Sequence, residues 1–383
     1  MTGNAPHPAN SCEFDLIVIG GGPAGTSAAI TAARSGARVL ILERGKFPRQ
    51  RVCGEFVSAE SLELLAGLLA SKRSTLLENA VRIREARLFF DGHTISTPIE
   101  PSAASIARFD LDAALWQAAA AAGATALQQT TVESISGNLP FLVHTSSASF
   151  LAGAVINASG RWSNLRSQPS RENGHTGGNV AGPKWLGLKA HFSESAPPCS
   201  VDLYFFEGGY CGVQPVRLAA EDQTTGRVNA CAMVRSDVAR SLSEVLAHHP
   251  QLKKRAEEWQ LLTEPVTTSP LIFREPVPVE NYILMAGDEA GFVDPFVGDG
   301  ISLALRSGAL AANSLLPFIQ RRRSLAEAAR EYDEAYRKNL LPVFRNSSRL
   351  RRLLNLPRHL RRSVGHVLEA APIVSRVLVR LTR

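Results

Sequence analysis

The chain has 383 residues, of which 45% are apolar and 20% charged, the composition of an ordinary folded protein rather than a disordered one. Its formal net charge is +7, but ten arginines against one glutamate give residues 345–383 a charge of +9 and leave −2 for the remainder. The basic character therefore belongs to the end of the chain. Because that end lacks interleaved aromatic residues, the sequence argues against a nucleic-acid partner.

The cysteines are odd in number and never occur in a CxxC spacing, which predicts neither a disulfide framework nor a zinc site; they are Cys12, Cys53, Cys199, Cys211 and Cys231. The nine histidines show no metal-ligand spacing either. No basic, apolar leader opens the sequence, and no apolar run approaches the length of a membrane span. We therefore expect a cytoplasmic protein without a metal ion.

Residues 14–44, "FDLIVIGGGPAGTSAAITAARSGARVLILER", read as a strand, a glycine turn, a small-residue helix and a second strand. Gly20, Gly22 and Gly25 form a GxGxxG pattern at the turn, where backbone amides can approach a pyrophosphate. Glu43 ends the second strand, where it can bind ribose hydroxyls. The unit predicts a dinucleotide-binding fold but does not distinguish NAD from FAD.

The following segments predict that this fold is interrupted. Residues 108–127 form an Ala-rich helix and residues 141–160 two strands, whereas apolar alternation between residues 185 and 278 is typical of a separate sheet. We expect an α/β protein with a doubly wound Rossmann-like nucleotide-binding domain, an inserted antiparallel β-sheet substrate domain and a helical C-terminal tail. The boundaries are 12–75, 101–166 and 280–330 for the nucleotide-binding parts, 76–100 and 183–279 for the sheet domain, and 331–383 for the tail. Residues 167–182 are expected to form a linker or loop.

Two Gly-Asp pairs stand in "AGDEAGFVDPFVGDGIS", residues 286–302. Asp288 follows the apolar strand "YILMA" and would point a carboxylate at a ligand hydroxyl. The second pair opens a helix at Gly300, whose unpaired N–H groups favour an anion or a carbonyl oxygen. Two ordinary turns before a surface helix are the alternative, because Gly and Asp are common turn residues.

"GGGPAG", "ILER", "ASGRWSNLR" and "GDEAGFVDPFVGDGIS" together resemble the flavoprotein superfamily of para-hydroxybenzoate hydroxylase, geranylgeranyl reductases and flavin-dependent halogenases, over about residues 14–330. The resemblance implies non-covalent FAD as cofactor and an FAD-dependent oxidoreductase. It also implies a set of cofactor-binding residues: Gly20, Gly22, Pro23, Ala24, Gly25, Glu43, Arg44, Arg51, Cys53, Gly54, Arg108, Asp288, Pro295, Gly298, Gly300 and Ile301.

The expected reaction is a monooxygenase-type oxidation of a hydrophobic aromatic, polyketide-like or prenylated small molecule. Reduction of isoprenoid double bonds, as the geranylgeranyl reductases suggest, stays open. So does a nucleotide-binding protein at a membrane surface that has no turnover. Flavin would carry the redox chemistry, and the protein would supply orientation, electrostatics and exclusion of water.

Three shorter segments bear on the site. "RQRVCGEF", residues 49–56, resembles the loop that passes the flavin in geranylgeranyl reductases and halogenases, which makes Cys53 a candidate catalytic thiol; a buried structural cysteine is the alternative. In "GYCGVQP", residues 209–215, Tyr210, Gly212 and Gln214 are predicted to line the substrate pocket, with Tyr210 a second catalytic candidate. Gly212 stands where the geranylgeranyl reductases and halogenases that the sequence resembles have a Trp. The alternative to a pocket at this position is a glycine that only permits a tight bend of the strand.

Ser159 occupies the position where an Asp is common in the superfamily and helps to organise FAD and a nicotinamide donor. The sequence therefore leaves two electron donors open, NAD(P)H and a partner reductase.

The tail segment "IVSRVLVRL" places Ile373, Val377 and Leu381 on one helical face and Arg376 and Arg380 on another. A basic amphipathic helix of this kind either packs on its own protein or contacts anionic lipid as a peripheral membrane segment.

Overall fold

The structure is a computed structural model that describes residues 13–70, 74–161, 165, 184–218, 226–271, 273, 275–293 and 298–354. The predicted linker at 167–182, the amphipathic segment at 373–381 and Pro295 lie outside the described residues.

The predicted β–α–β unit is present as β1 (Phe14–Ile19), α1 (Pro23–Arg34) and β2 (Val39–Leu42). β1 pairs in parallel with β2, and all four residues of β2 are buried. A parallel strand in such a fold is covered on both faces, which explains why both strands are nearly continuous apolar runs rather than alternating ones. The α/β class predicted from the sequence is thus confirmed.

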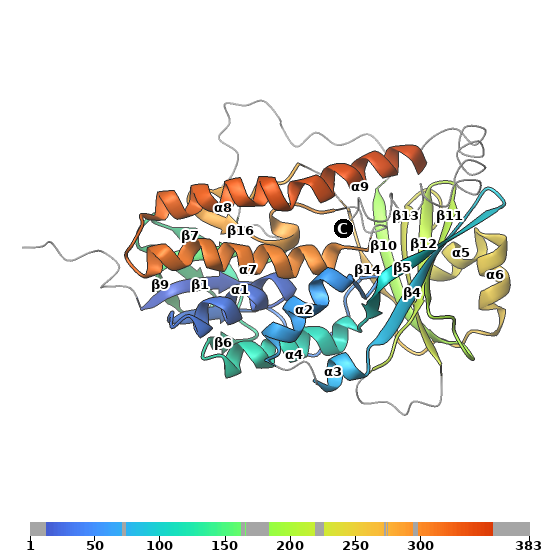
Figure 1. Cartoon of the computed structure of the whole chain (residues 1–383), viewed down its shortest axis with the longest axis horizontal. Helices are drawn as coiled ribbons and strands as arrows, with labels where there is room; N and C mark the ends of the chain where they lie inside the picture. The colour runs from blue at the N-terminus through green and yellow to red at the C-terminus, as the bar shows by residue number, and fades with distance from the viewer. Residues whose placement is uncertain are drawn as a thin grey trace, which may run out of the picture.

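The first sheet has the order β15-β16-β9-β1-β2-β6, with β7 and β8 attached beside β9. The pairs from β16 to β6 are parallel, whereas β7, β8 and β15 add antiparallel edges. The further strands are β6 (Thr125–Leu127), β7 (Val132–Ser136), β8 (Phe141–Thr145), β9 (Ser149–Asn157), β15 (Val279–Glu280) and β16 (Ile283–Met285). This sheet lies at the left of Figure 1.

The second sheet, at the right of Figure 1, has the order β14-β10-β13-β12-β11-β4-β5-β3. Its strands are β3 (Phe56–Val57), β4 (Val81–Phe90), β5 (His93–Ser105), β10 (Trp185–Ser193), β11 (Ser200–Phe206), β12 (Gly209–Pro215), β13 (Arg227–Arg235) and β14 (Val266–Thr268). The sheet is antiparallel except where β11 pairs in parallel with β4. These two strands are not joined by a hairpin, so no tight turn imposes the antiparallel direction on them.

The helices that contact strands of the first sheet are α1, α4 (Arg108–Ala121), α7 (Gly300–Ile319) and α8 (Leu325–Asn339). Helix α2 (Ala59–Leu68) packs on α7 and on β5, α3 (Thr75–Glu78) packs on α4, and α9 (Leu341–Leu354) continues from α8 toward the second sheet, whereas α5 (Leu242–Ala247) and α6 (Pro250–Arg255) accompany the second sheet. Helix α8 begins with a capping box between Ser324 and Glu327. Two 3₁₀ turns occupy Ala256–Glu258 and Gly287–Glu289.

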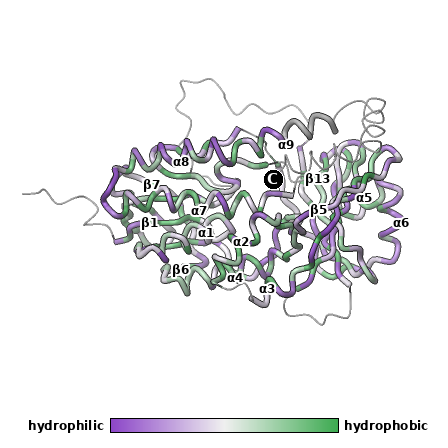
Figure 2. Tube along the Cα trace, viewed as in Figure 1, coloured by the Kyte–Doolittle hydropathy of each residue, from purple (hydrophilic) through white to green (hydrophobic). Residues whose placement is uncertain are grey.

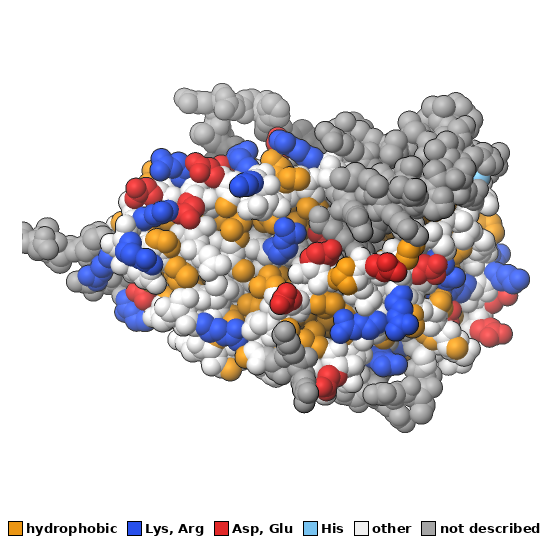
Figure 3. All heavy atoms as spheres, in the orientation of Figure 1, with side chains coloured by type: hydrophobic (Ala, Val, Ile, Leu, Met, Phe, Trp, Pro, Cys, Tyr) orange, Lys and Arg blue, Asp and Glu red, His pale blue; other side chains and the backbone are white. Residues whose placement is uncertain are grey.

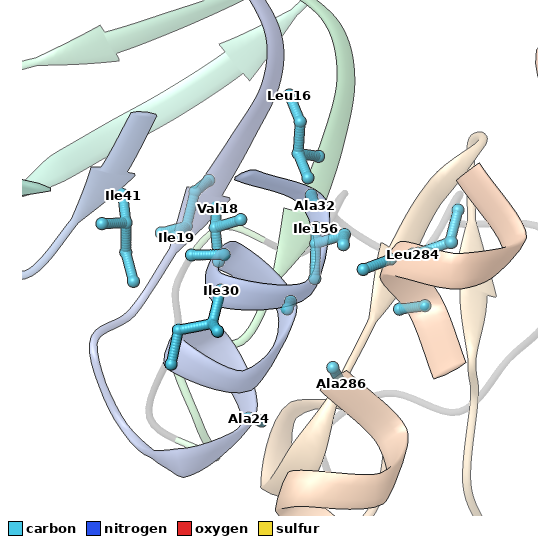
Figure 4. Close-up of a cluster of buried hydrophobic side chains, with 14 of the residues drawn as sticks. Leu16, Val18, Ile19, Ala24, Ile30, Ala32, Ile41, Ile156, Leu284 and Ala286 are labelled. Atoms are coloured by element: carbon cyan, nitrogen blue, oxygen red, sulfur yellow. The ribbon is translucent and has the colours of Figure 1, made fainter. Parts of the chain in front are cut away.

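The main core lies between the first sheet and its helices. Figure 4 shows its centre, where Val18 of β1, Ile30 of α1 and Ile156 of β9 meet and all three are fully buried. The hydropathy-coloured tube of Figure 2 shows the same arrangement, with green segments at β1, α1 and α7 and purple ones toward the outside. Helices α1 and α7 cross closely, and the Ser27 hydroxyl donates to the carbonyl of Leu305 at 2.7 Å.

Charged side chains of both signs are interspersed with hydrophobic ones over the coloured surface in Figure 3. Among the helices that the structure describes, none combines the length and the apolar character needed to cross a membrane.

Candidate functional site

A cavity of about 420 Å³ lies where the first sheet meets the second. Its wall combines residues that follow β1, β2 and β9 with residues of β10, β12, β13 and β14, and with the first turns of α1 and α7. Ligands of open α/β sheets bind at the carboxyl ends of the strands, and cofactor pockets have this order of volume. The cavity is therefore the candidate functional site.

The predicted glycine turn forms one end of the cavity. Gly20 has a φ of +101°, and a Cβ there would lie 2.3 Å from a backbone oxygen of the loop after β9, so the position requires glycine. Gly22, Pro23 and Ala24 line the cavity, and a Cβ on Gly22 would meet no atom within 4 Å. Gly25 is not on the wall; its Cβ would lie 1.8 Å from the carbonyl oxygen of Gly20, so this glycine lets the helix approach the turn.

Glu43 lies on the wall at the end of β2, as expected for a ribose-binding acid. Its carboxylate accepts hydrogen bonds from the backbone N–H of Gly21 at 2.8 Å and of Gly45 at 2.7 Å, and from the Arg49 guanidinium at 2.8 Å. Burial opposes the charged form, but Arg49 and the two amides hold the pKa of Glu43 below its usual value. The carboxylate is therefore ionised and fixed in position.

Arginines make the same end of the cavity electropositive. Arg44, Arg51 and Arg108 all line the wall. Arg108 is paired with Asp112 through two bonds of 2.7 Å, whereas Arg51 has no carboxylate partner among the described residues. Burial and the neighbouring arginines lower the pKa of Arg51 to about 10, which is still far above neutral pH. A half-buried, unpaired guanidinium of this kind favours a bound anion.

The distal Gly-Asp segment forms a second part of the wall, with Asp288, Gly298, Gly300 and Ile301. Burial raises the pKa of Asp288, and two nearby arginines only partly offset it. Helix α7 begins at Gly300, so its free N–H groups face the cavity as those of α1 do. Two helix N-termini, remote in sequence, thus converge on one space, and both favour negative charge or carbonyl oxygens.

The loop at residues 49–56 lies between these two parts of the wall. Cys53 and Gly54 line the cavity, and a Cβ on Gly54 would meet no atom within 4 Å. Cys53 is a free thiol of intermediate exposure, and the N–H of Glu55 approaches its sulfur at 3.3 Å. The candidate catalytic thiol therefore packs against the main core on one side and lines the cavity on the other.

A further part of the wall is apolar and comes mainly from the second sheet. Tyr210 is part of it, together with Met233, Leu271 and Phe292. Tyr210 therefore lies on the cavity wall, and its contact with a substrate stays a prediction.

Gly212 and Gln214 differ from the prediction, because neither is on the cavity wall. The space expected beside Gly212 is taken by Leu203 of the paired strand, whose Cδ2 would lie 3.3 Å from a Cβ at this position. Gln214 is buried instead and donates to the hydroxyl of Ser105 at 2.6 Å. We do not carry these two residues into the proposed site.

Several wall residues were not among the predicted site residues. They are Arg49, Gln50, Val52, Phe56, Gly187, Cys231, Ala232, Met233, Val266, Thr267, Thr268, Leu271, Phe292 and Val293. Most belong to strands whose apolar alternation predicts a sheet but not which face meets a ligand. Four of them, Arg49, Gln50, Val52 and Phe56, lie within the quoted loop motif at residues 49–56. Phe292 and Val293 lie within the quoted segment at residues 286–302, so these two motifs are the signals that could have included them.

FAD fits this cavity. The glycine cradle at Gly22 and the unpaired Arg51 suit its pyrophosphate, Glu43 suits a ribose, and the start of α7 at Gly300 suits the electron-rich edge of the flavin ring. The described residues contain no group of three or more His, Cys, Asp or Glu side chains that could hold a metal ion.

Two curated relatives match most of the chain. The menaquinone reductase of Mycolicibacterium smegmatis is 25% identical over 328 residues, which cover 78% of this chain and 75% of the relative. The digeranylgeranylglycerophospholipid reductase 2 of Methanopyrus kandleri is 27% identical over 361 residues, which cover 87% and 84%.

Solved structures share the fold. The myxobacterial chondrochloren halogenase, an FAD-dependent halogenase, superposes with a TM-score of 0.69 at 19% identity and covers 87% of this chain and 83% of its own. A geranylgeranyl bacteriochlorophyll reductase-like protein of Thermoplasma acidophilum gives 0.66 at 20% identity, with 90% and 88% covered.

The family models agree with the site. Two models described as FAD dependent oxidoreductase match, one over residues 15–59 and the other over residues 49–314, and the second range alone spans most of the chain and includes the loop, the second sheet and the start of α7. With the glycine turn and the distal Gly-Asp segment on one cavity, the chain belongs to the FAD dependent oxidoreductase family.

Proposed function

We propose that this protein uses FAD to reduce a carbon–carbon double bond in a hydrophobic molecule that carries an isoprenoid chain. The observation that carries the proposal is the place of Cys53, a free thiol on the cavity wall between the cofactor-binding end and the apolar face of the second sheet. The names of the two curated relatives support it, because both denote reductases of molecules with isoprenoid chains.

The residues on the cavity wall indicate which part of the reaction the cofactor supplies and which part the protein supplies. Reduced FAD, when bound, supplies two electrons as a hydride to one carbon of the double bond. The other carbon needs a proton, and we assign its delivery to the Cys53 thiol, which then recovers a proton from solvent. Tyr210, Met233 and Leu271 provide the apolar surface that holds the chain and excludes water.

The electron donor is part of the proposal. Ser159 lines the cavity, and its hydroxyl lies within hydrogen-bonding distance of Asn157 Oδ1 and, at 3.3 Å, of Glu289 Oε2. The hydroxyl is thus engaged with its own neighbours and offers no carboxylate to organise a nicotinamide. We infer that a partner reductase, rather than bound NADPH, reduces the flavin. Rapid anaerobic bleaching of the flavin by NADPH alone would contradict this inference.

The test is an anaerobic reoxidation experiment. Photoreduced holoenzyme is mixed with menaquinone or with a geranylgeranylated lipid, and flavin absorbance is followed. The products are then exposed to air, which returns any quinol to the quinone, so that mass spectrometry reports only the reduction of carbon–carbon double bonds. We expect reoxidation without oxygen and a product heavier by two hydrogen atoms. Cys53→Ala should keep its flavin and lose this reaction, whereas Cys199→Ala, at an exposed cysteine, should behave as the parent does. Reoxidation only with oxygen, together with oxygen insertion, would favour monooxygenase chemistry instead.

A further inference from the structure

A cluster of buried charged and polar side chains lies next to Cys53, and the proposed reaction does not use it. Glu55 and His191 are fully buried, and Lys189 is 1% exposed. Glu55 belongs to the cavity loop, whereas Lys189 and His191 are two residues apart on β10 and point to the same face of the second sheet. Burying such groups is unfavourable unless each is paired, so the contacts of the cluster identify its role.

The backbone of Glu55 is held in an unusual conformation. Its φ is +63°, in the left-handed region that residues other than glycine, asparagine and aspartate rarely adopt. Such strain persists only where the surroundings over-determine the conformation, and it concentrates at functional sites. Here the strained residue is itself on the cavity wall, as are Cys53 and Gly54 just before it.

The carboxylate of Glu55 joins three segments of the chain. One oxygen accepts from Lys189 Nζ at 2.6 Å and from the backbone N–H of Arg108 at 2.9 Å; the other contacts His191 Nε2 at 2.8 Å. Burial favours the neutral acid, but Lys189 and His191 outweigh it and lower the pKa of Glu55 to about 2. Lys189 also donates to Gln50 of the same loop at 2.9 Å.

The backbone of Glu55 completes the attachment. Its carbonyl accepts from the N–H of Ile106 at 2.9 Å, and its own N–H contacts Cys53 Sγ at 3.3 Å. The carbonyl of Cys53 accepts from Asn229 Nδ2 of β13 at 3.0 Å. The loop is therefore tied to β10, to β13 and to the start of α4, and four of these six contacts are made by Glu55.

A buried ion pair contributes little net stability, because desolvation offsets the attraction, and neutral residues of similar volume often replace it without loss. The contribution of this cluster is therefore to geometry. We propose that Glu55 is a positioning residue that fixes the Cys53 thiol and the first turn of α4 on the cavity wall, with Lys189 and His191 as its anchors on the second sheet. The effect on turnover rests on the proposed reduction, whereas the effect on the thiol does not.

The test replaces the charged pair by neutral residues of similar length, Glu55→Gln with Lys189→Met, in the FAD-bound protein. Alkylation of Cys53 by iodoacetamide is followed by mass spectrometry, with the exposed Cys199 as the internal reference. We expect Cys53 to react roughly fivefold faster or more, the change that a modest loss of loop ordering produces. The rate at Cys199 should match the parent, and the comparison is made on protein that retains flavin. With substrate, kcat should fall while KM changes little.

The matched control is Asp202→Asn. Asp202 of β11 is fully buried, pairs with Arg87 of β4 and with Arg255 of α6, and is not on the cavity wall. It should alter thermal stability and leave the reactivity of Cys53 unchanged. A control that accelerates Cys53 as much as the double variant would overturn the proposal, because the effect would then be general loosening.

Parental reactivity of Cys53 in the flavin-bound double variant would also overturn it. If that variant does not fold, Glu55→Asp serves instead: it keeps the charge, but its shorter side chain cannot hold all three contacts, and faster alkylation is again expected, with parental reactivity overturning the proposal. A changed thiol reactivity in a protein that reduces no double bond would support the positioning role and refute the proposed reaction.

Discussion

The crossing of α1 and α7 controls the shape of the glycine turn, and Gly308 is the residue on which this crossing depends. A Cβ at Gly308 would lie 2.0 Å from the carbonyl oxygen of Ala24, which is backbone and cannot move away by changing a rotamer. Ala24 also lines the cavity. Gly308→Ala should therefore separate the two helices and disturb the first turn of α1.

The magnitude follows from two opposing effects. Alanine is favoured over glycine by about 1 kcal/mol in a helix interior, which would stabilise α7. Overpacking a buried contact costs roughly 1–3 kcal/mol, and an approach as short as this one belongs at the upper end of that range. We expect a net loss of about 2 kcal/mol in the free energy of unfolding, the difference between these two effects.

Gly67→Ala is the matched control, because a Cβ at this helical glycine of α2 would meet no atom within 4 Å. It should leave stability unchanged or raise it by up to about 1 kcal/mol. The assay is thermal unfolding followed by flavin fluorescence, with the ratio of FAD to protein after gel filtration. A Gly308→Ala protein that melts at or above the parental temperature with full flavin content would refute the reasoning.

Three further outcomes are expected. Asp288→Ala should purify with less FAD, measured as the ratio of flavin to protein absorbance, and an equally yellow variant would remove this residue from the cofactor site. Tyr332→Phe should lower the unfolding free energy by about 1–2 kcal/mol in denaturant titrations, because it leaves the buried carbonyl of Met285 without its 2.7 Å hydrogen bond; an unchanged midpoint would count against this. Burial raises the pKa of Asp299 from 3.8 to about 6, so its protonated form stabilises the fold fully below pH 3.8 and this stability is lost as the pH rises through 6. Asp299→Asn should therefore raise the free energy of unfolding by up to about 3 kcal/mol at pH 8, and by less at pH 5. The melting temperature measured at the two pH values checks this, and a larger increase at pH 5 than at pH 8 would contradict the raised pKa of Asp299.

The β–α–β unit and the ends of the FAD site could be predicted from the sequence because their signals are local. The apolar runs of β1 and β2, the turn at Gly20 and the helix start at Gly300 are each encoded by a few neighbouring residues. Backbone preferences and periodicity act over that distance. Only the resemblance to a known family indicated that the turn and the distal helix start meet at one ligand.

The tertiary structure alone decided which side chains reach the cavity. Gly212 lies on the same strand face as Tyr210, but the side chain of Leu203 on the paired strand fills the space beside it. The alternation of residues along a strand does not encode the size of a side chain on the neighbouring strand. Lys189 and His191 lie more than 130 positions from Glu55 in the chain, and in the sequence they are merely two polar residues in a strand. Their burial against one carboxylate depends on how the two sheets pack. Packing is a property of side-chain volumes from distant segments, which no local pattern contains.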